Sequence, residues 1–166
     1  MEAILTRRSI RQFKDQPVSK EIIDELLRAA MAAPSAGNRQ PWHFVVLTDH
    51  NIMDKIPEFH PHSTMLIQAA AAIAVCWDKN SELADGYGIQ DAAAAMENIL
   101  LAAHSFGLGA VWLGIFPRLH RVEKLKRLLN LPEHIMPMGV VAIGHPDEKK
   151  PPANRFDPKK VHFEKW

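Results

Sequence analysis

Apolar residues recur every three or four positions in several stretches of the chain, which is the spacing of one helix face. The first stretch follows Ser19, a residue type that caps helix N-termini, and a helix there has to end before Pro34. The longest stretch, residues 88–106, is rich in alanine and predicts a central helix buried on much of its circumference. Residues 119–129 predict a further helix, and residues 51–56 a short one.

Short apolar runs between these helices predict β-strands over residues 43–48, 70–77, 110–115 and 138–143. Because helices and strands do not alternate regularly, the order favours an α+β fold, with helices flanking a mixed or antiparallel sheet. No change of composition marks a domain boundary, so we expect residues 1–166 to form a single domain. Residues 146–166 are polar and proline-rich, and we expect an extended C-terminal tail that lies over another surface, such as a partner subunit.

The formal net charge of the chain is +1, which gives no general attraction to nucleic acid or to a membrane surface. Cys76 is the single cysteine, so an internal disulfide is excluded and a reducing compartment is expected. The first residues lack the pattern of a signal peptide, and the longest apolar run, residues 69–77, is too short to span a bilayer. We therefore expect a cytoplasmic protein that binds neither nucleic acid nor a membrane.

An arginine-rich motif near the N-terminus is a candidate phosphate site. Arg7, Arg8, Ser9 and Arg11 place three guanidinium groups and a hydroxyl within five residues. Arginine offers forked N–H donors that match phosphate oxygens. A solvated basic N-terminus would contain the same residues, so both interpretations stay open. Arg155 in the polar tail is either a solvated side chain or a further phosphate contact that would order the tail.

The segment from Pro34 to Trp42 is dense in hydrogen-bonding side chains for a connection between a helix and a strand. Its two prolines lock their own φ angles, and between them lie four polar side chains: Ser35, Asn38, Arg39 and Gln40. The pattern predicts a loop that holds a polar, planar ligand. The alternative is an ordinary connection in which Trp42 packs into the core.

The glycines near the central helix have two interpretations. Gly107-Leu108-Gly109 ends the helix, and Trp112-Leu113-Gly114 ends the strand that follows. A glycine after a bulky strand allows a flat ligand to approach the backbone, although a helix cap and a strand end explain the same residues. The segment is no dinucleotide-binding fingerprint, because it follows a helix and lacks a third glycine at the required spacing.

Several other polar residues favour structural roles. A metal site is not predicted at His60-Pro61-His62, because no cysteine or carboxylate cluster accompanies the two histidines. The basic residues within 118–127 are interpreted as a solvated helix face opposite the leucines. Glu97 and Asn98 need polar partners if the central helix is as buried as its pattern predicts.

Taken in order, these segments resemble the nitroreductase family of flavin enzymes. The resemblance rests on the Arg-Arg-Ser-x-Arg start, the Pro-Ser-x-x-Asn-x-Gln-Pro-Trp loop, the Gly-Leu-Gly helix end, the Trp-x-Gly strand, the Gly-His-Pro turn and a late arginine. Each motif is weak alone, but their joint order and spacing are specific and span nearly the whole chain. The resemblance implies a nitroreductase-like α+β homodimer that binds two FMN molecules in its interface.

In that family the arginine-rich start grips the FMN phosphate, and the Pro-Ser loop reaches across from the other subunit. The segment at the end of the Trp-x-Gly strand faces the isoalloxazine ring. The resemblance therefore implies a set of FMN-binding residues in this chain: Arg7, Arg8, Ser9, Arg11, Pro34, Ser35, Ala36, Asn38, Gln40, Leu113, Gly114 and Arg155. Arg11 is also a candidate for the N1–C2 edge of the flavin, where a cation stabilises the reduced form.

The implied chemistry is a ping-pong reaction in which NAD(P)H reduces the flavin and a second substrate then occupies the same face. No side chain has to act as an acid or base, so no catalytic residue is predicted. Only residues 78–87 stand where longer members insert a helical lid. We therefore expect an open site with residues 59–64 and Tyr87 at its rim, and acceptors such as nitroaromatics or quinones. The alternative is a flavin-binding carrier or redox sensor without turnover.

Overall fold

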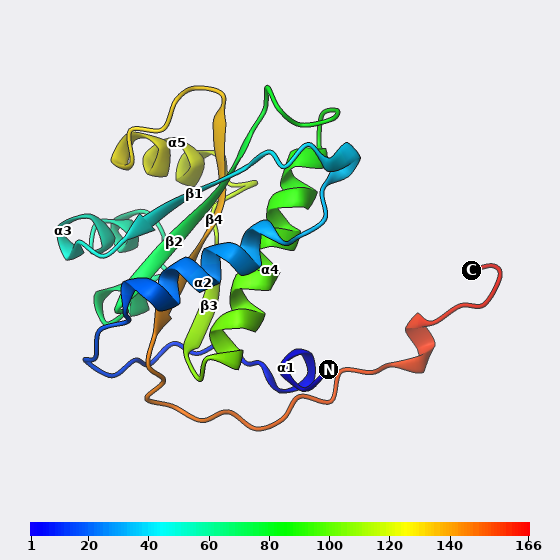
Figure 1. Ribbon diagram of the computed structural model, residues 1–166, viewed down its shortest axis with the longest axis horizontal. Coiled ribbons are helices and arrows are strands. Elements are labelled where there is room, and N and C mark those ends of the chain that lie inside the picture. Colours follow the sequence, from blue (N-terminus) through cyan, green and yellow to red (C-terminus); the bar gives the residue numbers. More distant parts are fainter.

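A four-stranded antiparallel sheet with strand order β1-β2-β4-β3 forms the centre of the computed structural model, which describes residues 1–166 (Figure 1). The strands are β1 (Trp42–Leu47), β2 (Ala71–Asp78), β3 (Gly109–Gly114) and β4 (Ile135–Gly144). Because β1 and β3 are the two edges, the last strand along the chain lies inside the sheet. The predicted α+β class is confirmed, and the sheet is the antiparallel of the two predicted alternatives.

Helices cover both faces of this sheet (Figure 1). One face is covered by α2 (Lys20–Met31) and α4 (Tyr87–Ser105), and the other by α3 (His50–Met53) and α5 (Leu119–Leu128). The Ser19 hydroxyl accepts the Ile22 N–H at 3.4 Å, so the predicted N-cap of α2 is confirmed. The remaining elements are α1 (Glu2–Thr6) and the 3-10 helices η1 (Ala36–Asn38), η2 (Ile56–Glu58), η3 (Thr64–Ile67) and η4 (Pro158–Lys160).

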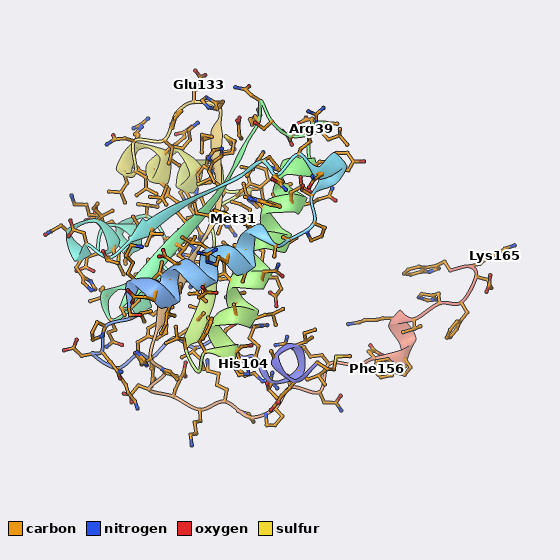
Figure 2. The ribbon with its side chains drawn as sticks, in the orientation of Figure 1. Met31, Arg39, His104, Glu133, Phe156 and Lys165 are labelled. Carbon is orange, nitrogen blue, oxygen red and sulfur yellow. The ribbon has the colours of Figure 1, made fainter.

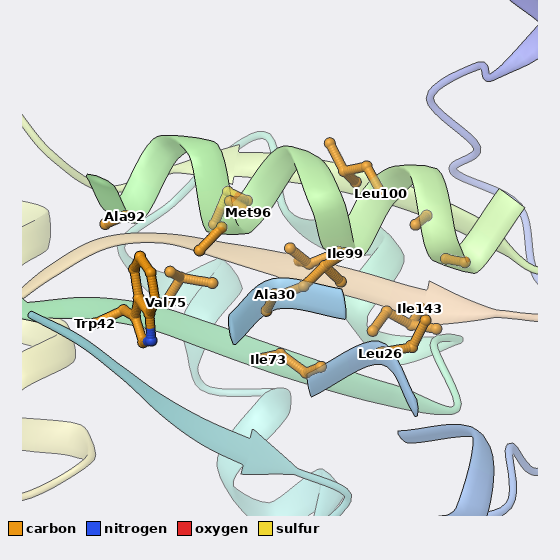
Figure 3. Close-up of a cluster of buried hydrophobic side chains, with 14 of the residues drawn as sticks. Leu26, Ala30, Trp42, Ile73, Val75, Ala92, Met96, Ile99, Leu100 and Ile143 are labelled. Atoms are coloured by element: carbon orange, nitrogen blue, oxygen red, sulfur yellow. The ribbon is translucent and has the colours of Figure 1, made fainter. Parts of the chain in front are cut away.

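The sheet separates two apolar cores. Alternate residues of β2 point to opposite faces, so Ile73 and Val75 join the α2–α4 core while Ala72 and Ala74 join the other. Figure 3 shows the α2–α4 core, in which side chains of both helices meet the sheet: Leu26, Ala30, Ala92, Met96 and Ile99. Alanines on α4 allow the helix to lie close to its neighbours, which explains the composition of the predicted central helix.

Strand β4 begins at Ile135, three residues before the predicted start at Met138. The prediction missed this part because Pro137 is unusual in an inner strand. A bulge accommodates it: Cys76 pairs with Pro137 and Val75 with Gly139, which leaves Met138 as the extra residue.

The N-terminal segment extends the sheet beyond its edge strand. Residues 2–6 form α1, which the sequence pattern did not predict, and Ser9 then makes a parallel bridge to Ala110 of β3. The Ile10 N–H donates to the Ala110 carbonyl at 3.0 Å. Further along, Phe13 bridges to Pro146. The start of the chain therefore lies between β3 and the start of the tail.

The tail after residue 146 has no regular secondary structure except η4, and its last residues project away from the sheet (Figure 1). Figure 2 shows Phe156 and Lys165 on this projecting part. Its aromatic side chains are exposed: Phe156 is 78% exposed, Phe163 85% and Trp166 100%. Nowhere in the chain is a helix both long and apolar enough to cross a membrane.

Candidate functional site

The Pro34–Gln40 loop is ordered by its own polar side chains. The Gln40 N–H donates to the Ser35 hydroxyl at 2.9 Å, and the Gln40 amide donates to the Asn38 side chain at 3.1 Å. Asn38 and Gln40 have φ values of 54° and 50°, a left-handed region in which asparagine is enriched among non-glycine residues. The loop is therefore a compact, polar turn rather than a simple connection, while Trp42 packs into the core as its alternative interpretation expected.

A buried carboxylate anchors this loop to α4. Asp91 is 5% exposed, and its Oδ1 accepts the Ala36 N–H at 2.9 Å. Its Oδ2 is buried and has no hydrogen-bond partner. The sequence reasoning missed Asp91, although a single acidic residue within an alanine-rich, buried helix stretch was the available signal.

One arginine of the arginine-rich motif, Arg8, makes hydrogen bonds both within the N-terminal segment and to the tail. Arg8 Nε donates to the Pro151 carbonyl at 2.9 Å, and Arg8 Nη1 donates to the Leu5 and Arg7 carbonyls at 3.1 Å and 2.6 Å. These bonds tie the motif to the start of the tail. Arg8 Nη2 is buried without a partner, and an unsatisfied buried donor costs about 1–3 kcal/mol. An acceptor such as an anion oxygen would satisfy it.

Two half-buried polar residues of α4 have polar partners within the chain. Glu97 Oε1 lies 3.3 Å from Arg7 Nε in an ion pair. The Asn98 amide donates to the Ala29 carbonyl of α2 at 2.9 Å. Arg7 therefore binds the middle of α4, and Asn98 joins the two helices on this face of the sheet.

A cationic cavity of about 320 Å³ lies between the arginine-rich motif, the end of α4 and the start of the tail. Arg8, Lys149 and Lys150 line it together with a single carboxylate, Glu148. Glu148 Oε1 accepts the Arg11 N–H, and Lys150 Nζ lies 3.3 Å from the same oxygen. The chemistry of this cavity suits a small anion.

The remaining predicted phosphate ligands are less engaged. Ser9 uses its backbone for the bridge to Ala110. The side chains of Arg11 and Arg155 make no hydrogen bond or ion pair within the chain, and both residues are exposed. Their guanidinium groups are therefore available to a ligand.

Within one chain, the motif and the loop flank α4 and do not share a pocket. The loop contacts α4 at Asp91, whereas the motif contacts it at Glu97 and, through the 2.7 Å Thr6 Oγ1···His104 Nε2 contact, at His104. These positions lie about 9 Å and about 20 Å further along the helix axis. Figure 2 shows Arg39 beside the first turns of α4 and His104 near its last turn. No hydrogen bond joins the two segments.

The end of β3 is open. Leu113 is buried, but Gly114 faces free space: a Cβ built there has no heavy atom within 4 Å beyond its chain neighbours. The N-terminal segment pairs only with the start of the strand, at Ala110. No further strand therefore pairs with the outer edge of the second half of β3, and Trp112 on it is 36% exposed.

His60 and Arg121 lie close together behind this open end. Arg121 Nη1 donates to the Gly114 carbonyl at 2.9 Å, and His60 Nε2 lies 3.0 Å from the same oxygen. Burial, and then the positive charge of Arg121, lowers the pKa of His60. The interpretation of the basic α5 face as solvated is wrong for Arg121, which is half-buried. His60, which was expected at the rim of the site, is instead buried in the interior.

The antiparallel sheet, the long alanine-rich helix on one face and the arginine-rich segment along the edge strand define a nitroreductase-like α+β protein. The sequence model described as "Nitroreductase family" matches residues 4–60 and 58–145, and the chain belongs to this family. The resemblance stated from the motifs is therefore confirmed.

Relatives match the chain over its whole length. A protein of Methanothermobacter thermautotrophicus named "Putative NADH dehydrogenase/NAD(P)H nitroreductase" is 48% identical over 100% of this chain and 87% of its own length. A solved structure from Parabacteroides distasonis that bears the same name is 43% identical, with a TM-score of 0.96 over 99% of this chain and 97% of its own. A solved structure from Desulfovibrio desulfuricans described as "a putative nitroreductase in complex with fmn" is 32% identical, with a TM-score of 0.89 over 99% of this chain and 96% of its own.

Proposed function

We propose that this protein is an FMN-dependent NAD(P)H oxidoreductase that passes electrons on to a small acceptor. Family membership and the related FMN complex support the class of cofactor. When bound, FMN would accept a hydride from NAD(P)H and deliver electrons to the acceptor. The protein's part is to bind the flavin, orient it and set its electrostatic surroundings.

The residues of this chain fit a flavin phosphate at the N-terminal motif. Arg7, Arg8, Ser9 and Arg11 would hold it, together with Arg155 of the tail. The observation that carries the proposal is the buried, unpartnered Nη2 of Arg8 beside a cavity lined by Lys149 and Lys150. A phosphate oxygen supplies the acceptor that this donor lacks and neutralises the surrounding charge.

The open end of β3 fits the flat part of the flavin. The empty space at Gly114 leaves room for a ring, which would lie against the backbone of Leu113 and Gly114. In this proposal the ring contacts main-chain atoms at the end of β3. No acidic or basic side chain is assigned to catalysis.

The separation of the loop from the motif supports a homodimer. Pro34, Ser35, Ala36, Asn38 and Gln40 would contact the flavin of the neighbouring subunit, since the loop flanks α4 within its own chain. Exposed apolar side chains on α2, at the two ends of α4 and along the tail would be covered by such a partner: Met31, Tyr87, Phe106, Phe156, Phe163 and Trp166. In this arrangement the tail lies over the partner subunit and needs no contacts of its own.

The proposal is tested with the purified protein. Its visible spectrum before and after addition of FMN reports flavin binding, and anaerobic addition of NADH or NADPH should bleach the flavin bands. A preparation that binds no FMN overturns the proposal. A flavin-loaded protein that neither nucleotide reduces favours the alternative of a carrier or redox sensor. Sedimentation of the loaded protein tests the homodimer.

The acceptor is proposed to be a nitroaromatic, a quinone or a similar small molecule, reduced by a ping-pong mechanism. Only residues 79–86 connect β2 to α4, so no long lid covers the edge of the sheet. Parallel lines in double-reciprocal plots with varied NADH or NADPH and acceptor would support ping-pong kinetics, and intersecting lines would contradict it. The cytoplasmic location stays a prediction.

A further inference from the structure

The Gly114 carbonyl is held from behind by two side chains that the proposed function does not use. His60 lies between η2 and η3, and Arg121 belongs to α5, so both reach the end of β3 from the same sheet face. They are separated from Gly114 by 54 and 7 residues along the chain. Only the fold brings these two side chains to the same carbonyl, which suggests that they act together on the Gly114 backbone.

The contacts of the His60 ring indicate which of its nitrogens carries the proton. His60 Nδ1 accepts the His62 N–H at 3.3 Å, and we therefore assign the proton to Nε2, which donates to the Gly114 oxygen and also lies 3.1 Å from Arg121 Nη1. Arg121 Nη1 donates to the same oxygen at 2.9 Å. Both lone pairs of the carbonyl are therefore occupied. We call His60, Arg121 and the Gly114 carbonyl the carbonyl clamp.

The clamp holds the carbonyl of the peptide that joins Gly114 to Ile115. The N–H of the same peptide points in the opposite direction and donates to the Met138 carbonyl at 3.2 Å. The clamp and this bond together fix the Gly114–Ile115 peptide at the point where β3 stops pairing with β4. Since Gly114 lacks a side chain and faces open space, hydrogen bonds must supply the rigidity that packing supplies elsewhere in the strand.

The charge of Arg121 is not neutralised by an acidic residue. None of the ion pairs in the structure includes Arg121. Its Nε is buried and has no hydrogen-bond partner. The nearest polar partners of the guanidinium are therefore the Gly114 carbonyl and the neutral His60 ring. Its positive charge lies on the opposite side of the Gly114 backbone from the open space.

We propose that His60 and Arg121 are positioning residues that fix the Gly114 backbone for the bound flavin and place a positive charge behind it. This inference rests on the proposed function, because it assumes that the flavin ring lies against the open end of β3. A fixed backbone lowers the ordering cost of binding. The half-buried cation stabilises negative charge on a ligand at this end, which favours reduced over oxidised FMN.

The first experiment tests the clamp without flavin. The ¹³C carbonyl signal of Gly114 and the amide signal of Ile115 are compared in the flavin-free wild type, in Arg121→Met and in His60→Phe. Both signals should move in both variants, because each variant removes one donor from the carbonyl. Arg127→Met is the matched control, since Arg127 is an exposed arginine of the same helix whose side chain makes no hydrogen bond. Unmoved signals in the two clamp variants overturn the clamp.

The second experiment measures FMN binding and the midpoint potential of the bound flavin. Arg121→Met should raise the FMN dissociation constant about tenfold. Reduced FMN should lose about tenfold more affinity than oxidised FMN, which makes the two-electron potential about 30 mV more negative. Arg121→Lys keeps the charge and should restore most of the potential. His60→Phe should weaken binding with a smaller shift of potential, because it removes a donor without removing the charge.

The outcomes separate this inference from the proposed function. If the wild type binds no FMN, the proposed function fails and the flavin role of the clamp fails with it, while the carbonyl signals still report the clamp. If the wild type binds FMN but Arg121→Met matches Arg127→Met in affinity and potential, the proposed function survives and the positioning role is overturned. Thermal unfolding of every variant shows whether weaker binding follows a loss of fold.

Discussion

The two ends of strand β3 both carry a glycine, but their surroundings are opposite. At Gly109 a Cβ would lie 2.7 Å from Ile10 Cγ2, because the N-terminal segment packs directly over the strand. At Gly114 a Cβ would meet nothing within 4 Å. The first glycine is required by close packing, whereas the second leaves a space in front of a backbone that His60 and Arg121 hold from behind.

This difference separates stability from ligand binding along six residues of one strand. The closed end joins the start of the chain to the sheet and contributes to folding. At the open end the space that a Gly114 Cβ would enter holds no protein atom, so it is free for a ligand. Substitutions at the two ends should therefore change different measured quantities.

The largest effect is expected at the closed end. Gly109→Val should lower the free energy of unfolding by about 3 kcal/mol, because its side chain overlaps the β-branched Ile10. Urea denaturation followed by circular dichroism measures this loss. Gly114→Val is the matched control and should change stability by less than about 0.5 kcal/mol. Equal losses at both positions would show that the two ends are packed alike.

Arg11 tests whether the closed end also contributes to the ligand site. Arg11→Ala should weaken FMN binding by roughly 1.5–3 kcal/mol, as expected for the loss of a hydrogen bond to a charged group. Its exposed side chain makes no hydrogen bond within the chain, so stability should hardly change. Flavin fluorescence titration measures the affinity, with Arg127→Ala as the control. An unchanged FMN affinity would remove Arg11 from the site.

A small substitution at the open end should affect binding alone. Gly114→Ala should weaken FMN binding about tenfold, or about 1.4 kcal/mol, because its methyl group enters the space assigned to the flavin. The urea midpoint should stay at the wild-type value. If FMN binds Gly114→Ala as tightly as wild type, the ring does not lie against this end of β3.

The smallest effect concerns the pH dependence behind the open end. His60 is 3% exposed and has a lowered pKa, so the folded state disfavours its protonation. Its contribution to stability is complete above the unfolded pKa near 6.5 and falls as the pH drops below that value. From pH 7.5 to 5.5 the loss should be at most about 1.4 kcal/mol. Urea titrations at both pH values measure it.

His60→Phe is the control for this pH dependence, because phenylalanine keeps the ring and removes the titrating group. The variant should lose the part of the acid destabilisation that His60 causes. A pH dependence identical to that of the wild type would assign the effect to other histidines. His62, whose N–H donates to His60, is the first neighbour to examine.

The positions of most elements could be predicted from local patterns. The Ser19 cap, the apolar spacing of the central helix and the β-rich runs are properties of adjacent residues, and they placed α2, α4, α5 and the strands within a few residues. Pro137 misled the prediction because a bulge, which depends on the facing strand, accommodates it. Helix α1 was missed because its residues bury nothing and give no amphipathic signal.

The candidate site was only partly predictable for the same reason. The motifs identified the segments that carry Arg8, Ser35 and Gly114. The family model confirms the family that these motifs suggested. They did not reveal Asp91, because its partner at Ala36 lies 55 residues away along the chain. Nor did they reveal Arg121, whose neighbours on α5 suggested a solvated face.

By itself the sequence determined the α+β class, the order of the elements and the family, because spacing and motif order are recorded locally along the chain. Only the tertiary structure decided which of these residues work together. It separated the arginine-rich motif from the Pro34–Gln40 loop across α4, and it left Gly114 open while it filled the space at Gly109. Burial and hydrogen-bond partners depend on distant chain segments, so no local pattern could have assigned them.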